Sequence, residues 1–252
     1  MNNIKNIVVV FLSLVFGCKT DKKTEKIMTW YDGEPKQLHK EYSLIITASD
    51  TILNEVFTEY YRNGNPKHIL NYKLGNPDGQ LESYFSNGKV ELIKTYNEGV
   101  LNGYSRDYFL KGNIKFEVNY NNGFMDGSMI EYLYSGDTSI IINLSNGVKN
   151  GTTQIYDSLG RIASRSNYKN GELDGSFTAY YENGKISIRR FYQNGQKKGV
   201  AKTYYRNGEL KLSFFYVNNK EEGKGTIYDS LGKVIEERLY KNGELKSYRQ
   251  FN

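Results

Sequence analysis

A glycine series with a fixed spacing of 24 residues constrains this chain more than any other feature of its sequence. The series runs through Gly64, Gly88, Gly112, Gly136, Gly160, Gly184, Gly208 and Gly232. A second series begins at Gly75, with Asn219 as its one exception, and a third begins at Gly79. No insertion or deletion interrupts them between residues 60 and 252. A fixed period of this length predicts stacked structural repeats, each in contact only with its neighbours.

Tyrosine follows the same period in two columns. The first column is Tyr60, Tyr84, Tyr108, Tyr132, Tyr156, Tyr180, Tyr204 and Tyr228. The second column is Tyr72, Tyr96, Tyr120, Tyr168, Tyr192, Tyr216 and Tyr240, with Leu144 in the remaining place. One interpretation is structural, with cross-strand aromatic contacts that stiffen a thin sheet. The other is a candidate binding surface, a groove for a protein segment or a glycan, because tyrosine is rigid and half polar.

Each repeat reads as a β-hairpin. Residues 176–199 contain two runs rich in β-formers, each bounded by a glycine-containing turn. Asn-Gly between strands is a strong hairpin signal, because both residues of the turn then need a positive φ. Most third-series glycines follow Asp or Asn, which predicts further turns. We therefore predict an all-β fold, an elongated single-layer antiparallel sheet of eight stacked 24-residue hairpins over residues 60–252.

Alternation along the strands predicts two unlike faces. The columns that begin at Pro66, His68 and Tyr72 are expected on one face, and they are largely apolar or aromatic. The opposite face, which begins at Lys67, is mainly polar. Because the alternation is incomplete, we expect both faces to be partly wet and the sheet to remain a single layer. Helix is disfavoured, since each interior glycine would cost about 1 kcal/mol.

The first 17 residues have the plan of a signal peptide. Lys5 precedes an apolar run over residues 7–16, and Gly17 precedes Cys18, the only cysteine. The run is too short to span a bilayer as a helix. It resembles a bacterial lipoprotein signal, which implies export, lipid attachment at Cys18 and anchoring in a membrane. Lys19 after the cysteine favours the outer membrane by the same resemblance. A plain membrane anchor or an ordinary signal peptide with an incidental cysteine are the alternatives.

Two segments separate the signal from the repeats. Residues 18–26 comprise Cys18 and a stretch without apolar residues, which predicts a flexible tether. Residues 27–59 are irregular, and Gly33-Glu34-Pro35-Lys36 echoes Gly64-Asn65-Pro66-Lys67. We predict a degenerate first repeat that caps the stack, with strands at residues 44–48 and 52–58.

Charge and residue types argue against several classes of function. The net charge is +6, but basic and acidic residues alternate, whereas nucleic-acid binding favours a stripe of one sign. His39 and His68 are the only histidines, and no set has the spacing of a metal site or a catalytic triad. We interpret His68 as a tolerated substitution in an apolar column. We expect no enzyme activity, no metal, no cofactor and no nucleic acid.

The repeat resembles the bacterial variant of the MORN repeat. The resemblance rests on Tyr-Tyr-x-Asn-Gly-Lys followed by Tyr-x-Asn-Gly-x-x-x-Gly, as in Tyr180 to Gly199. Proteins of this kind are often catalogued as YwqK-type antitoxins. Tyr156-Asp157-Ser158-Leu159-Gly160 and Tyr228-Asp229-Ser230-Leu231-Gly232 are also similar to the Tyr-Asp repeats of large secreted shell-forming proteins. The strict period and the third glycine series favour the MORN variant.

Together these observations predict a lipid-anchored, non-enzymatic scaffold that binds a protein partner at the cell envelope. The partner itself is unknown. One alternative is an antitoxin-like protein that binds and neutralises a toxin. Another is a glycan-binding module of the envelope.

Overall fold

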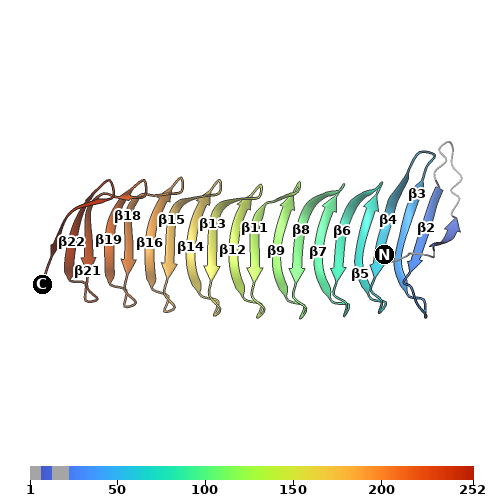
Figure 1. The fold of residues 1–252 in the computed structure, drawn as a ribbon, viewed down its shortest axis with the longest axis horizontal. Helices are drawn as coiled ribbons and strands as arrows, with labels where there is room; N and C mark the ends of the chain where they lie inside the picture. The colour runs from blue at the N-terminus through green and yellow to red at the C-terminus, as the bar shows by residue number, and fades with distance from the viewer. Residues whose placement is uncertain (1–6, 13–22) are drawn as a thin grey trace. The chain divides into compact units, whose positions relative to one another are not determined.

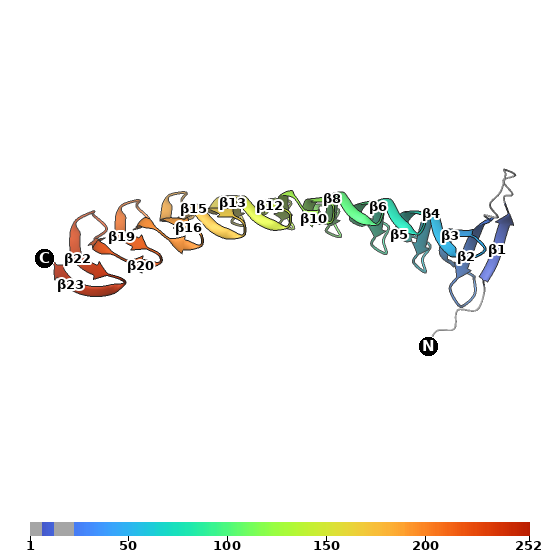
Figure 2. The ribbon, with the colours of Figure 1, turned by 90° about the horizontal axis from the view of Figure 1, so that it is seen from above.

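The computed structural model describes residues 7–12 and 23–252, and every regular element in these ranges is a β-strand. No helix in the described part is long and apolar enough to cross a membrane. The chain forms two compact units, which divide between Phe124 and Met125. Figures 1 and 2 show each unit as one layer of strands. The single-layer, all-β prediction is confirmed for both units.

Unit 1 is an antiparallel sheet in which each strand pairs with the next one in sequence. Its strands are β1 (Ile7–Leu12), β2 (Lys23–Trp30), β3 (Leu38–Ile46), β4 (Thr51–Tyr60), β5 (Pro66–Lys73), β6 (Asn76–Tyr84), β7 (Val90–Asn97), β8 (Val100–Tyr108) and β9 (Ile114–Asn121). The short strand β10 (Phe124–Met125) lies at the division between the units.

Unit 2 repeats the same antiparallel pattern. Its strands are β11 (Gly127–Tyr132), β12 (Thr138–Ser145), β13 (Val148–Tyr156), β14 (Ile162–Lys169), β15 (Glu172–Tyr180), β16 (Ile186–Gln193), β17 (Gln196–Lys197), β18 (Gly199–Tyr204), β19 (Leu210–Val217), β20 (Lys220–Glu221), β21 (Gly223–Tyr228), β22 (Val234–Lys241) and β23 (Glu244–Gln250). β17 with β18 and β20 with β21 each take the place that one strand fills elsewhere.

The second glycine series forms the tight hairpin turns that the sequence predicts. Asn146 and Gly147 have φ values of 49° and 78°, and Asn218 and Asn219 have 49° and 69°. Positive φ at both central residues is the type I′ geometry, which matches the twist of the flanking strands. The exception at Asn219 therefore keeps the turn, because asparagine tolerates the left-handed region.

The first series uses a different turn, so the expectation of two positive φ values is wrong there. Only the glycine has a positive φ in these turns, as at Gly64 with 87°. The Gly64 N–H donates to Tyr61 O at 3.0 Å, and the Tyr61 N–H donates to Asn65 O at 2.8 Å. This is a type I turn followed by a left-handed glycine, the pattern of longer hairpin loops.

The glycines of the third series lie within strands and not in turns. The prediction that they form further turns is therefore wrong. Gly79 has a φ of 95° within β6, and the register shifts between the pairs Leu70↔Leu81 and Tyr72↔Pro77. Residues 78–80 of β6 thus lie opposite Asn71 of β5, so β6 carries two extra residues there; with the left-handed glycine this is a β-bulge. The preceding Asp78 caps the next repeat, since its Oδ1 accepts the Glu98 N–H at 3.2 Å.

Hydrogen bonds between successive repeats hold the turns in line. The Gly99 N–H donates to Pro77 O at 2.7 Å, and the Gly195 N–H donates to Leu173 O at 2.9 Å. On the opposite edge, Asn183 Nδ2 donates to Arg206 O at 2.9 Å. Each repeat thus satisfies backbone groups of its neighbour, which a lone hairpin would leave to water.

The layer has very little interior. Ile27 and Val118 are the buried apolar side chains of the described residues, with exposed fractions of 5% and 1%. Several buried side chains are small and polar, including Ser83, Ser105 and Thr153. Burial is therefore shallow, and both faces are partly wet as predicted.

The first two strands of the described chain include residues of the predicted signal peptide and tether. Lys23–Lys26, expected within the flexible tether, form the first half of β2 and pair with β3. Ile7–Leu12, part of the predicted signal peptide, form β1 and pair with β2. Cys18 lies outside the described residues.

The predicted cap contains two strands near the expected places, β3 and β4. The repeat pattern also extends into it. Glu55 lies 24 residues before Gly79 and has a φ of 65°, and Asn54 Oδ1 accepts the Leu74 N–H at 3.2 Å. The opening segment is thus a repeat in which Glu55 occupies the glycine position.

Candidate binding surface

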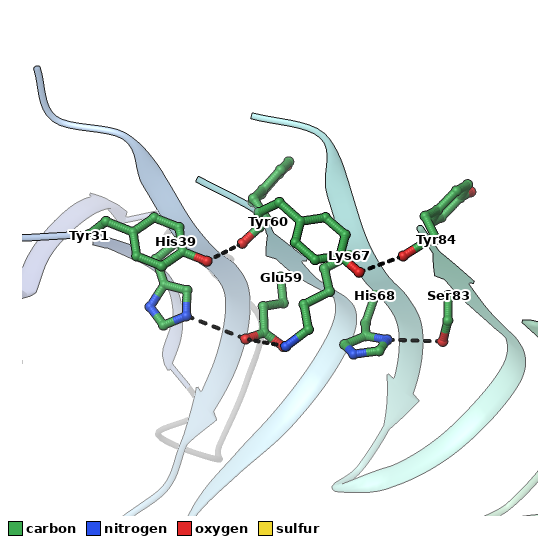
Figure 3. A network of polar contacts seen from close by, with 9 residues as sticks. Tyr31, His39, Glu59, Tyr60, Lys67, His68, Ser83 and Tyr84 are labelled. Atoms are coloured by element: carbon green, nitrogen blue, oxygen red, sulfur yellow. Dashed lines mark hydrogen bonds and ion pairs between the residues drawn. The ribbon is translucent and has the colours of Figure 1, made fainter. Parts of the chain in front are cut away.

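The two predicted tyrosine columns lie on opposite faces of the sheet, so they cannot line one groove together. The Tyr72 ring meets the Phe57 ring edge-on at 6.4 Å, and Phe57 shares its face with Glu59 by strand alternation. Tyr60 follows Glu59 directly and points away from it (Figure 3). The register shift between the pairs Glu59↔His68 and Tyr60↔Pro66 explains why Tyr60 and Tyr72 point to opposite faces. This corrects the expectation of a single tyrosine groove.

The first column is half-buried, and several of its hydroxyls are engaged. Tyr156 Oη donates to Gln154 Oε1 at 2.6 Å. Tyr84 Oη donates to a Glu82 carboxylate oxygen. Burial, together with this carboxylate, raises the pKa of Tyr84 to about 12. These tyrosines help to order the polar side chains of their own face.

The second column is also half-buried and packs against other side chains. Tyr192 and Tyr240 meet Phe177 and Phe214 edge-on at centroid distances of 6.5 and 5.8 Å. Lys197 Nζ lies 5.0 Å from the centre of the Tyr216 ring. Edge-on pairs and cation–π contacts each contribute about 0.5–1.5 kcal/mol. Cross-strand contact is thus one role of this column.

A third tyrosine column, which the sequence patterns did not single out, links the repeats directly. Tyr61 Oη donates to Tyr84 O at 2.8 Å, and Tyr205 Oη donates to Tyr228 O at 2.8 Å. Tyr31 does the same to Tyr60 O at 2.6 Å. The signal in the sequence is the Tyr-Tyr doublet, whose second ring carries this bond.

Where aspartate replaces the second tyrosine of the doublet, the turn is closed differently. Asp157 Oδ1 accepts the N–H groups of Leu159 and Arg161 at 2.9 and 3.0 Å. Arg161 then reaches the next repeat, donating from Nη1 to Glu182 O at 2.6 Å. Its guanidinium, as the leading cause, holds the pKa of Asp157 below the usual value. The Tyr-Asp motif is thus a local variant of the same turn.

Both histidines of the chain lie in one polar network of unit 1 (Figure 3). His39 Nε2 lies 3.3 Å from Glu59 Oε1, and Lys67 Nζ lies 3.5 Å from the same oxygen. On the next strand, His68 Nδ1 and Ser83 Oγ are 2.9 Å apart. His68 is therefore engaged with a buried serine, although its column is otherwise largely apolar. The contacts of Glu59 thus join β3, β4 and β5, and the contact between His68 and Ser83 joins β5 and β6.

The carboxylate at the centre of this network stays ionised. Partial burial of Glu59 favours its neutral form. The charge of Lys67, followed by that of Lys40 and a hydrogen bond from His39, outweighs this burial. The pKa of Glu59 is therefore lowered from its usual value. Within the part of the chain that the structure describes, His68 has no hydrogen-bonded carboxylate, so Ser83 and His68 do not form a nucleophilic triad.

A shallow hollow of about 480 Å³ opens beside this network. Its walls carry carboxylates, a lysine and aromatic rings, and include His68, Ser83, Phe85, Asp107, Phe109 and Lys115. No group of three or more side chains with metal-binding chemistry occurs among residues 7–12 and 23–252. The lining of the hollow thus combines charged side chains with aromatic rings.

The sequence matches a known family of repeat proteins. Six segments match the model of the MORN repeat variant, namely residues 56–74, 77–98, 101–122, 173–194, 197–218 and 221–242. They cover just over half of the chain. The chain belongs to the MORN repeat variant family. The MORN segments leave out residues 123–172, yet Asn146-Gly147 and Asn170-Gly171 form the same turns there. The comparison with curated proteins gives no significant match.

Proposed function

We propose that this MORN repeat protein is an exported, lipid-anchored scaffold that binds a partner protein at the cell envelope. The observation that carries the proposal is the way the repeats use their backbones. Bonds such as Gly99 N–H to Pro77 O and Tyr61 Oη to Tyr84 O are made between repeats. Side chains are thus displayed in rows at a regular spacing on both faces, as in other repeat proteins that bind through extended surfaces.

The support for export comes from the sequence. The apolar run over residues 7–16, followed by Gly17-Cys18, has the order of a lipoprotein signal. A chain with several acyl groups at Cys18 would stay on a membrane far better than one with a single group. The scaffold would then present its repeats at a fixed surface.

A labelling and crosslinking experiment tests this proposal. The full-length protein and a Cys18→Ala variant are expressed in the same cells with an alkyne fatty acid. We expect only the unaltered protein to carry the label and to be found in the membrane fraction. Chemical crosslinking followed by mass spectrometry should then identify one envelope protein bound to the anchored form. A Cys18→Ala variant that keeps the label, or an absence of any crosslinked protein from both forms, would contradict the scaffold.

The same experiment separates the antitoxin alternative. If the crosslinked protein arrests growth when expressed alone and loses that effect when the MORN protein is present, neutralisation replaces scaffolding as the function. The measurement is the growth rate with and without co-expression.

The hollow in unit 1 favours a glycan as a second candidate ligand. Aromatic rings at Phe85 and Phe109 offer a flat apolar surface, and Asp107 offers oxygen acceptors beside it. Sugars present an apolar ring face and hydroxyl donors, which such a wall complements. The protein is titrated with soluble envelope oligosaccharides, and binding is monitored by tyrosine fluorescence. We expect saturable binding, which Asp107→Ala should weaken. No change in fluorescence at millimolar sugar would exclude this candidate.

A further inference from the structure

One column of the repeat changes character in the last three repeats. It is polar in the earlier repeats, where its members are Asn71, Thr95, Asn119, Asn143 and Asn167. In the later repeats the same position holds Phe191, Phe215 and Leu239. This change leaves the 24-residue period intact, so it does not serve the fold in an obvious way.

The polar members of the column are occupied within the sheet. Asn143 Nδ2 donates to Thr152 Oγ1 at 2.8 Å, and Asn167 Nδ2 donates to Ser176 Oγ at 3.0 Å. They also pack over the bulge glycines, since a Cβ on Gly151 would lie 3.2 Å from Asn143 Cβ. The small polar side chain thus fills the space beside the bulge.

The apolar members of the column instead project into solvent. Phe191, Phe215 and Leu239 are 49%, 44% and 48% exposed. Val200, the register partner of Phe215, is 49% exposed. A Cβ on Gly199 would meet no atom within 4 Å, whereas at Gly151 and Gly175 it would meet Asn143 and Asn167. We name Phe191, Val200, Phe215 and Leu239 the apolar row. Contiguous exposed apolar side chains of this kind mark interaction sites.

Three basic side chains, Arg165, Arg189 and Lys202, form a basic row beside Phe191 and Val200. Beside Phe215 and Leu239 the same positions hold Ser213 and Glu237, and Glu237 forms an ion pair with Lys224. Arg165 pairs in register with Thr178, Thr178 with Arg189, and Arg189 with Lys202. Arg189 lies two residues from Phe191 on the same strand and therefore on the same face, about 7 Å away. In the described chain, no ion pair joins Arg165, Arg189 or Lys202 to a carboxylate. Like charges directly opposite each other are unfavourable, so Arg189 and Lys202 favour a negatively charged neighbour.

The spacing of the apolar row matches a helix. Equivalent positions in successive repeats are two strands apart, which is about 9.6 Å. Seven residues of an α-helix rise about 10.5 Å. A helix that lies across the strands could thus place one apolar side chain between each pair of row members. A single file of side chains is narrow for a bilayer surface but suits one segment of chain.

We infer that the apolar row and the basic row together bind an amphipathic, acidic helix of the partner protein. The helix places its apolar side on Phe191, Val200, Phe215 and Leu239. Its acidic flank faces Arg165, Arg189 and Lys202. This inference rests on the proposed protein-binding function and gives it a location and a partner chemistry.

Photocrosslinking in cells tests the location. The photoreactive residue p-benzoylphenylalanine replaces Phe215 in one protein, Tyr192 in a second and Tyr104 in a third. Tyr104 is the matched control, because its ring is 62% exposed but lies far from the row in sequence. We expect position 215 to capture a peptide rich in Asp and Glu with apolar residues at helical spacing. The double variant Arg189→Glu, Lys202→Glu should abolish this product.

The outcomes distinguish the inference from the proposed function. Capture of a protein at position 192 but not at 215 overturns the helix site and leaves the scaffold. Capture of lipid or of a second copy at position 215 also overturns the helix site. Capture of no protein at any position contradicts both.

Substitution by the residue that other repeats use tests the contact without disturbing the fold. The captured peptide is synthesised and its binding is measured by fluorescence anisotropy. Phe191→Asn and Phe215→Asn should each weaken binding at least about tenfold, as expected for a central aromatic contact. Leu231→Asn, which alters an 88% exposed apolar side chain on a turn, should leave binding unchanged. Equal affinity of all four proteins would overturn the inference, provided that circular dichroism shows them folded.

Discussion

Individual residues in this protein occupy backbone positions that their side chains do not favour. Leu74 is the first residue of a type I′ turn and has a φ of 50°, where most other repeats have asparagine. Its side chain is 57% exposed and so gains little from burial. The left-handed region costs a residue with a branched side chain more than it costs asparagine.

Replacing Leu74 by asparagine should therefore stabilise the protein. We expect Leu74→Asn to raise the free energy of unfolding by about 0.5–1 kcal/mol. Urea unfolding followed by circular dichroism measures the change. The control is Leu110→Asn, which alters a similarly exposed leucine (55%) without a positive φ. An equal gain in both variants would point to surface polarity and not to the turn.

The raised pKa of Tyr84 predicts how the stability of the protein changes at alkaline pH. Its pKa is raised to about 12, first by burial and then by Glu82, while an unfolded tyrosine titrates near 10. The folded state therefore holds the proton more tightly, and this stabilisation is full below pH 10 and is lost as the pH rises towards 12. We expect Tyr84→Phe to lose less free energy of unfolding between pH 9 and pH 11 than the unaltered protein. Tyr248→Phe, at a 64% exposed ring, is the control and should follow the unaltered protein.

At the scale of the strand, polar contacts take the place of a core. The network around Glu59 joins β3, β4 and β5 where few apolar side chains are buried. In the sequence, His39 and His68 are 29 positions apart and stand in different contexts. Both lie beside Glu59 of β4, because His39 contacts its carboxylate from β3 and His68 of β5 is its register partner. Only the strand register could show this.

Removing the central charge should lower stability in a pH-dependent way. The lowered pKa of Glu59 means that its contribution is full above the unfolded value of about 4.3 and is lost as the pH falls through the folded value. Glu59→Gln should cost about 1 kcal/mol at pH 7 and much less at pH 3. Urea unfolding at both values measures this. Glu182→Gln, at a 72% exposed carboxylate paired with Arg206 at 3.8 Å, should change stability little at either.

At the scale of the whole molecule, each hairpin depends on its neighbours. The bonds that link repeats recur at the same positions, such as Gly171 N–H to Lys149 O and Gly195 N–H to Leu173 O. Stability in such a stack is a sum over repeats and the contacts between neighbours. Removing a whole period should therefore leave the remaining contacts in register.

Deletion of residues 173–196 tests this, because it removes 24 residues and joins Glu172 to Lys197 in phase. We expect a folded protein with an unchanged circular dichroism signal per residue and a smaller urea m-value, since less surface is exposed on unfolding. Deletion of residues 173–184 removes half a period and should abolish cooperative unfolding. If both deletions behave alike, the repeats do not act as independent units.

Much of this fold could be predicted from the sequence because it depends on local rules. The 24-residue period, the Asn-Gly turns and the absence of helix-forming stretches indicated stacked hairpins in a single layer. These features depend on the backbone preferences of glycine and asparagine, which act over two to four residues. The candidate surface was less predictable, because side-chain direction depends on every residue between two positions.

The side chains that each face displays depend on strand pairing, which local rules do not specify. Tyr60 and Tyr72 are an even number of residues apart, so simple alternation predicts one face for both. The bulge adds Lys67 to β5, opposite Glu59 and Tyr60 of β4, and it reverses the direction of the β5 side chains beyond it. The exposure of Phe191 and Phe215 likewise depends on which side chains the neighbouring strands place beside them. Local backbone preferences in the sequence thus specify the repeat and its turns, whereas the register between strands specifies which side chains meet and which face solvent.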